Sequence, residues 1–96
     1  MRRLVISHKA EADLRGIWLW SFRMFGETRA DRYLDDLDAA MRMCGSDPES
    51  GKNRDTLRVG YRSLLVGKHL VFYTFTDETV LIRRVLHGNM DPDRHV

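Results

Sequence analysis

Residues 45–51 read GSDPESG, and this stretch divides the chain into two parts with different periodicities. Pro48 cannot continue a helix, and it biases Asp47 away from the α conformation. Before the break the apolar residues recur at helical spacing, whereas after it they gather in short runs rich in Val, Leu, Phe and Tyr. The stretch therefore predicts a helical first half and a second half made of strands.

Two helices are expected before the break, at about Lys9–Phe25 and Thr28–Gly45. Ser7 precedes the first, and serine is a preferred helix N-cap because its side-chain oxygen accepts a hydrogen bond from a backbone N–H. A short strand at Leu4–Ile6 leads directly into this cap. Gly26 stands where the first helix should end, since glycine readily takes the left-handed conformation common at that position.

The two predicted helices differ in how much of their circumference is apolar. The second carries a stripe only about 120° wide, which suits one buried face. The first has an apolar arc of roughly half the circumference, with Trp18 expected in the core and Trp20 and Phe22 on the flanks. We expect the first helix to contact the sheet and also something else, either the second helix or a separate chain.

Three strands are expected after the break, at about Leu57–Val66, Leu70–Thr76 and Thr79–His87. The gaps at Gly67-Lys68 and Asp77-Glu78 are short enough for hairpins, so the strands should form an antiparallel meander. The order β-α-α-β-β-β predicts an α+β fold in which an N-terminal helical hairpin packs on a small antiparallel sheet. The helices would cover one sheet face and leave the other for a partner.

Composition limits the classes of protein to which the chain can belong. Its 96 residues suit a single domain over residues 1–96, and 43% hydrophobic with 31% charged residues is ordinary for a globular protein. No apolar run approaches the roughly 20 residues that cross a bilayer, and no signal peptide is recognisable, so we expect a cytoplasmic protein. The one cysteine and the scattered histidines and glycines predict no disulfide, metal or nucleotide cofactor.

The net charge of +2 is unevenly distributed. Residues 1–50 hold 8 Lys and Arg against 9 Asp and Glu, whereas residues 51–96 hold 8 against 5. Of the 16 basic residues 13 are arginine, whose planar guanidinium suits bidentate contact with carboxylate or phosphate. The electropositive second half therefore favours a macromolecular partner.

Several short strings resemble the ParE branch of the RelE/ParE toxin–antitoxin superfamily. In the second half they are RVGYRS at 58–63, HLVFY at 69–73 and RVLHGNMD at 84–91, followed by Arg94-His95. In the first half they are Ala12-Asp13-Leu14 with Ile17-Trp18, the Gly26 break, Ala30 with Tyr33, and Pro48 with Gly51. The resemblance spans nearly the whole chain, and it implies a RelE/ParE-like fold and the toxin of a type II toxin–antitoxin pair.

A ParD-like antitoxin is the partner that this resemblance implies, with its C-terminal segment wrapped around the helical hairpin and the sheet edge. The wide apolar arc of the first helix suits such a partner, because monomers rarely expose apolar patches larger than a few hundred Å². The residues expected at this contact are Leu14, Trp18, Trp20, Phe22 and Tyr33.

Two functions remain open at this point. In the first, the chain resembles ParE toxins in inhibiting DNA gyrase by binding alone; the expected target contacts are Arg58, Tyr61, Arg62, His69, Arg84, His87, Met90 and Arg94. In the second, it resembles RelE and is a ribosome-dependent messenger-RNA endonuclease. Arg62, Arg84 and His87 are then the candidate catalytic residues, because histidine serves as acid or base and arginine stabilises charge on phosphate.

The end of the chain favours the first function, in which the protein is not an enzyme. RelE-type nucleases often carry a tyrosine near the chain end, whereas residues 88–96 contain none and include Asp91 and Asp93, which would repel RNA. Strand alternation also separates Arg84 from both Arg83 and His87. His87 also has an ordinary explanation as an imidazole bonded to backbone, and the tail is either a frayed end or a binding segment.

Overall fold

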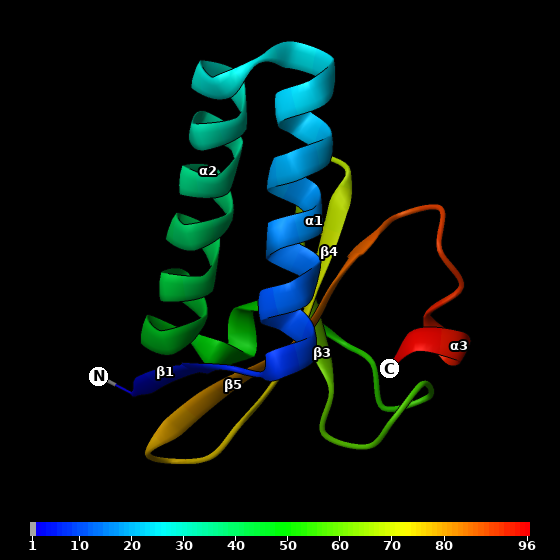
Figure 1. The fold of residues 1–96 in the computed structure, drawn as a ribbon. Coiled ribbons are helices and arrows are strands. Elements are labelled where there is room, and N and C mark those ends of the chain that lie inside the picture. Colours follow the sequence, from blue (N-terminus) through cyan, green and yellow to red (C-terminus); the bar gives the residue numbers. More distant parts are fainter. Residues whose placement is uncertain (1) are drawn as a thin grey trace.

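In the computed structural model, which describes residues 2–96, a helical hairpin lies over one face of a five-stranded sheet (Figure 1). The α+β fold class expected from the sequence is confirmed. The elements are β1 (Arg3–Ile6), α1 (His8–Phe25), α2 (Glu27–Ser46), the 3-10 helix η1 (Pro48–Ser50), β2 (Lys52–Asn53), β3 (Arg62–Val66), β4 (His69–Phe75), β5 (Thr79–His87) and α3 (Pro92–His95).

Both ends of α1 follow the predicted capping residues. The Ser7 Oγ accepts a hydrogen bond from the Ala10 N–H at 3.0 Å, and it donates to the Arg83 carbonyl at 2.9 Å. The cap therefore also ties the start of α1 to β5. Gly26 ends α1 and precedes α2 with a φ of 90°, which favours glycine, although its ψ of 172° is extended and not left-handed helical.

The sheet has the strand order β1-β5-β4-β3-β2. The meander of β3, β4 and β5 is antiparallel, as predicted, whereas β1 pairs in parallel with β5 from Arg3–Thr79 to Ile6–Ile82. The sheet is therefore mixed at this edge and not wholly antiparallel. Within residues 2–96 no helix is long and apolar enough to cross a bilayer.

The predicted strand Leu57–Val66 is wrong in its first part, because β3 begins only at Arg62. Residues 54–61 form a turn-rich loop that is closed by a hydrogen bond from the Arg54 N–H to the Tyr61 carbonyl at 2.8 Å. Asp55 holds this loop from inside by accepting the Gly60 N–H at 2.9 Å. A carboxylate that satisfies backbone donors stabilises a turn against an extended strand.

Apolar side chains form a cluster on each face of the sheet. The cluster between sheet and helices contains Ala10, Ile17, Leu37, Met41, Cys44, Val71, Tyr73, Val80, Ile82 and Val85. The second, which we term the outer cluster, contains Tyr61, Phe72 and Leu86, with Leu57, Leu70 and Val96 packed against it. The outer face is thus partly covered by the chain's own 54–61 loop and C-terminal residue, which corrects the expectation that it is left for a partner.

A bulge in β5 changes which arginines share a face. Tyr73 pairs with Ile82 and Phe72 pairs with Arg84, so Arg83 is an extra residue in the ladder. Arg83 lies over the ring of Tyr61 while Arg84 is opposite Phe72, so both are on the outer side. The predicted separation of Arg83 from Arg84 is therefore wrong. The separation of Arg84 from His87 is confirmed, since Val85 belongs to the helix-side cluster and His87 follows it at an interval of two.

Candidate functional site

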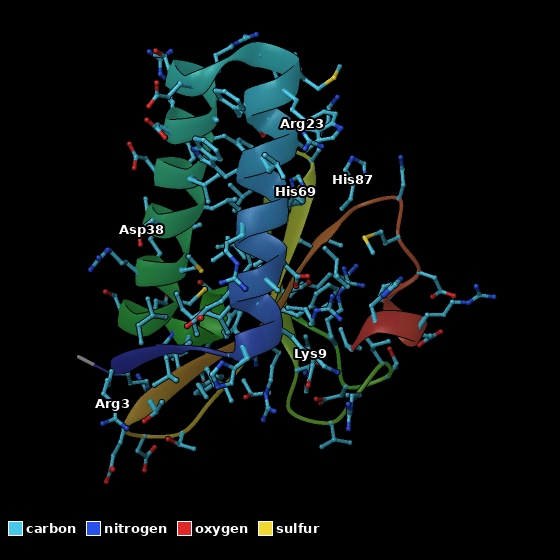
Figure 2. All side chains as sticks on the ribbon, viewed as in Figure 1. Arg3, Lys9, Arg23, Asp38, His69 and His87 are labelled. Atoms are coloured by element: carbon cyan, nitrogen blue, oxygen red, sulfur yellow. The ribbon has the colours of Figure 1, made fainter. Side chains whose placement is uncertain are left out.

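A groove of about 800 Å³ lies between α1 and the adjacent ends of β4 and β5. Its walls come from one face of α1, the first turns of α2, the β3–β4 turn and the segment after β5. The residues that line it include Asp13, Gly16, Trp20, Phe25, Arg29, Arg32, Tyr33, Asp36, Lys68, His69, His87 and Met90. Figure 2 shows His69 and His87 next to each other at the strand ends beside the helices.

Apolar side chains of α1 are exposed along this groove. Trp20 is 54% exposed and Phe25 is 51% exposed, and their rings meet edge to face with 5.8 Å between centroids. Gly16 keeps the wall open, since no atom lies within 4 Å of the position where a Cβ would stand. Exposed aromatic rings beside an open backbone suit the apolar face of a partner segment.

The charge at the rim of the groove is mainly positive. Arg29, Arg32 and Lys68 line it, and the Arg29 guanidinium lies 5.2 Å from the centre of the Phe25 ring. Two carboxylates also line it, but Asp13 is paired with Arg84, which leaves Asp36 against three cations. A partner with acidic side chains near its apolar residues would therefore complement this rim.

Two histidines and a tyrosine lie together in the wall of the groove, and a hydrogen bond joins Tyr33 to His69. The Tyr33 hydroxyl lies 2.6 Å from His69 Nδ1 and donates to the Val66 carbonyl at 3.1 Å, while the Lys68 N–H donates to it at 3.2 Å. A hydroxyl has one proton, so these contacts are all satisfied when His69 donates from Nδ1. Its Nε2 is then an acceptor.

His87 completes this wall with the opposite tautomer. Its Nδ1 accepts the Asn89 N–H at 3.1 Å, so the neutral ring carries its proton on Nε2. The two imidazole rings are 5.3 Å apart at 80°. Burial lowers the pKa of His69, and the neighbouring His87 lowers it further. His69 is therefore neutral at physiological pH and offers a hydrogen-bond acceptor.

The residues expected at the antitoxin contact do not all line the groove. Trp20 and Tyr33 do, whereas Leu14 packs against the helix-side cluster. Trp18 stacks on Phe22 with centroids 5.1 Å apart, and its Nε1–H donates to the Asp31 carboxylate on α2 at 2.8 Å. The expectation that Trp18 is a core residue is wrong, because its indole is only half-buried and bridges α1 and α2.

Three of the expected target contacts have internal partners. Arg84 donates from Nε and Nη2 to the two Asp13 oxygens, each at 2.8 Å, and from Nη1 to the His95 carbonyl at 2.6 Å. Arg62 donates from Nη1 to the carbonyls of Glu49 and Gly51, and Tyr61 is buried in the outer cluster with 8% exposure. We therefore assign these three side chains to stabilising the fold.

The candidate catalytic residues of the endonuclease alternative do not converge. Arg62 pairs with Tyr73, whereas His87 pairs with His69, which lies four residues away on β4 or about 13 Å at the rise of a strand. The guanidinium of Arg84 is held by Asp13 at the edge of β5. Within residues 2–96 no three metal-ligating side chains gather either. The structure therefore provides no shared acid–base and phosphate site from Arg62, Arg84 and His87.

The tail is ordered by capping and packing. The Met90 N–H donates to the His87 carbonyl at 2.9 Å, Asp91 caps α3 by accepting the Asp93 N–H at 3.0 Å, and Val96 packs against the outer cluster. Met90 is left at the groove with 37% exposure, and Arg94 is exposed 3.9 Å from Asp91. Of the two interpretations of the tail, the frayed end does not fit these contacts.

Some residues of the site were missed from sequence. Asp13 stood out only as part of the family resemblance, because its partner Arg84 is 71 positions away. Phe25 and Arg29 fall on either side of the Gly26 break, and only the fold shows that both line one groove. Gly16 offered a signal in the sequence, because a glycine inside a helical pattern lowers helix stability relative to alanine.

Comparison with known proteins agrees with this fold. The family described as "ParE toxin of type II toxin-antitoxin system, parDE" matches residues 4–92. Toxin ParE1 of Mycobacterium tuberculosis is 38% identical over 95 residues, covering 98% of this chain and 97% of that toxin. Toxin ParE1 of Caulobacter vibrioides is 35% identical over 96 residues, covering 100% of this chain and 99% of that toxin.

A solved structure shows the same fold. A chain of the chromosomal ParDE toxin–antitoxin system from P. aeruginosa superposes with a TM-score of 0.79 at 20% sequence identity, covering 91% of this chain and 96% of that one. The resemblance that the short strings indicated is confirmed by relatives that match over their full length. The chain belongs to the ParE toxin family of type II toxin–antitoxin systems.

Proposed function

We propose that this toxin stops growth by binding DNA gyrase without chemistry of its own, and that a ParD-like antitoxin neutralises it by occupying the groove. One observation carries the proposal. His69, His87 and Met90, which are expected target contacts, line the same groove as the exposed Trp20 and Phe25. A single segment seated there would cover both sets of residues, so neutralisation follows from occlusion.

The groove supports an amphipathic antitoxin segment. Trp20 and Phe25 offer aromatic area to apolar side chains, and Arg29, Arg32 and Lys68 offer donors to acidic ones. His69 Nε2 adds one acceptor for a donor of the segment. Such a pattern fits a short helix or strand with an apolar side and an acidic side.

Binding without chemistry is supported by how the candidate catalytic residues are used. The guanidinium of Arg62 donates to backbone carbonyls and that of Arg84 donates to Asp13, and both residues lie apart from His87. The groups that remain for a target are the exposed Arg58, Met90 and Arg94 and the half-buried His69 and His87. These are contact groups, and a protein target is the simplest use of them.

The first experiment separates the two candidate targets. The toxin is induced without antitoxin, and gyrase supercoiling and cleavage assays are run in parallel with mapping of messenger-RNA cuts. We expect inhibited gyrase and intact transcripts. Codon-phased cuts on translated messages with normal gyrase activity would instead establish the endonuclease.

The second experiment tests the groove as the antitoxin site. Trp20→Ala should weaken binding of the cognate antitoxin by at least about tenfold, because exposed tryptophans are frequent hot spots of interfaces. Leu19→Ala removes a side chain of similar exposure that does not line the groove, and it should leave the affinity unchanged. Equal effects of the two substitutions would place the antitoxin elsewhere.

A further inference from the structure

Three arginines on the outer sheet face form a cluster of which the proposed function uses only Arg58. Their guanidinium groups lie over the two aromatic rings of the outer cluster. Arg58 and Arg83 lie 5.6 Å and 5.7 Å from the centre of the Tyr61 ring, and Arg54 lies 5.7 Å from that of Phe72. We term Arg54, Arg58 and Arg83 the arginine cluster.

The positive charge of the arginine cluster is not neutralised by the chain. Within residues 2–96 none of the three guanidiniums has a carboxylate oxygen within 4.0 Å. Arg54 Nε donates to Ser63 Oγ at 2.8 Å and Arg83 Nε donates to Thr74 Oγ1 at 3.2 Å, and both acceptors are uncharged. The terminal nitrogens are therefore available to an anionic ligand, while the Nε bonds and the rings hold two of the guanidiniums in place.

The nearby acids have other partners. Asp55, in the same loop as Arg58, accepts hydrogen bonds from the Gly60 N–H and the Asn53 amide. Asp91 caps α3 and lies beside Arg94. The carboxylates of Asp91 and Asp93 repel an anion that approaches the end of the chain, so the affinity should be modest.

We propose that the arginine cluster binds the phosphate backbone of duplex DNA. A guanidinium fork matches phosphate oxygens, and three cations without carboxylate partners on one face suit a ligand that presents several phosphates at close spacing. The inference concerns DNA alone and does not depend on gyrase being the target.

The burial of the two rings distinguishes duplex DNA from single strands. Proteins that bind single-stranded nucleic acid stack bases on exposed aromatic side chains. Here Tyr61 is 8% exposed and Phe72 is fully buried, and their faces are covered by the chain's own guanidiniums. The surface therefore offers charge without a stacking platform, which suits a ligand whose bases are already paired.

The test measures binding of the purified chain to a labelled DNA duplex by fluorescence anisotropy at increasing salt. Three phosphate contacts predict a slope of about −2.7 in log affinity against log salt, or about a 40-fold loss between about 50 and 200 mM salt. Replacing all three arginines by glutamine should abolish most of this dependence. The matched control replaces Arg3, Arg15 and Arg23, which are exposed on β1 and α1, and should leave slope and affinity unchanged.

A second variant is needed because Arg54 is half-buried, so its replacement could disturb the fold. Arg58→Gln with Arg83→Gln leaves Arg54 in place and should reduce the slope by about 1.8, with thermal unfolding confirming the fold. The proposal is overturned if the duplex does not bind, or if the control variant loses as much affinity. It is also overturned if single-stranded RNA, polyglutamate or anionic lipid vesicles bind more tightly than the duplex.

Discussion

Asp13 joins three segments of the chain through one carboxylate. Its Oδ1 and Oδ2 accept hydrogen bonds from Arg84, and Oδ2 also accepts the Val85 N–H at 3.0 Å. The same guanidinium donates to the His95 carbonyl, so α1, β5 and the tail meet here. The side chains of Arg84 and Asp13 are only 17% and 15% exposed, which shields the pair from solvent. Such a pair stabilises mainly because breaking it leaves one charge buried and unpaired.

Replacing Asp13 by asparagine should therefore destabilise the chain. The amide keeps an acceptor for Val85 but removes the charge opposite Arg84, so we expect a loss of about 2 kcal/mol in the free energy of unfolding. Chemical denaturation measures this change. Asp38→Asn breaks the exposed pair with Arg42 and should have no measurable effect. A similarly small effect of Asp13→Asn would show that Arg84 is not held by charge.

His69 makes the stability of the fold depend on pH. Burial and the neighbouring His87 lower its pKa from the ordinary value of 6.5, so the unfolded chain binds a proton more readily than the folded chain. The contribution of His69 is present above about pH 6.5, and it is lost as pH falls from there to the lowered folded pKa. The free energy of unfolding should decrease between about pH 7.5 and 5.5.

A variant isolates the part of this dependence that His69 causes. His69→Asn removes the titrating ring, so the same series of denaturation curves should show a weaker loss on acidification. His8→Asn, an exposed position at the start of α1, is the control and should keep the full dependence. An unchanged pH profile in His69→Asn would assign the effect to another group.

At the scale of elements, hydrogen bonds from β4 hold the turn at residues 48–51, which separates the helices from the strands. The Tyr73 hydroxyl of β4 donates to the Pro48 carbonyl at 2.6 Å and accepts the Gly51 N–H at 3.0 Å. Burial raises the pKa of Tyr73 to about 12, so the hydroxyl stays protonated and keeps its donor. The turn that separates the two halves is therefore anchored in the core.

Two glycines should respond to alanine in opposite directions. A Cβ at Gly51 would collide with the Tyr73 hydroxyl and stand 3.0 Å from the Ser63 carbonyl, so Gly51→Ala should cost about 2 kcal/mol of stability. A Cβ at Gly16 meets nothing within 4 Å in the middle of α1, so Gly16→Ala should stabilise by about 0.5 to 1 kcal/mol. Thermal unfolding of the two variants compares them directly, and the same sign for both would contradict the steric explanation.

At the scale of the whole molecule, the two proposed binding surfaces lie on opposite sides of the sheet. The groove is on the side of the helical hairpin, whose place over the sheet Figure 1 shows. The arginine cluster lies with the 54–61 loop on the outer face. An antitoxin segment confined to the groove would leave the arginine cluster uncovered. Antitoxin binding and DNA binding are then compatible, which a ternary complex in the anisotropy assay would reveal.

Cys44 offers a probe of global unfolding. It is fully buried on α2 within the helix-side cluster, and burial raises its pKa to about 11, so at neutral pH it is an inaccessible thiol. Alkylation should proceed only as fast as the chain unfolds and should follow the unfolded fraction in denaturant. Cys44→Ala with Ser46→Cys moves the thiol to an exposed position and should label at once. Rapid labelling of native Cys44 would reveal local opening of α2.

Much of the architecture could be predicted because it depends on local rules. Ser7 and Gly26 bound α1 through capping and a positive φ, and the short gaps between the last strands allow only hairpins. The start of β3 could not be predicted from the apolar run at Leu57, which resembled a strand. In the structure Asp55 accepts the Gly60 N–H and so stabilises a turn over these residues. Strand propensity is a weak guide where side chains accept the hydrogen bonds that backbone N–H groups would otherwise make within a sheet.

The sequence by itself determined the α+β order, the capped first helix, the antiparallel meander and the family, because these depend on residues that are neighbours in the chain or on the pattern of the chain as a whole. The tertiary structure alone decided the Asp13–Arg84 pair, the Tyr33–His69 bond and the stacking of Arg83 on Tyr61. The physical reason is distance along the chain. These contacts join residues 71, 36 and 22 positions apart, and the bulge at Arg83, which local periodicity does not encode, shifts which side chains share a face.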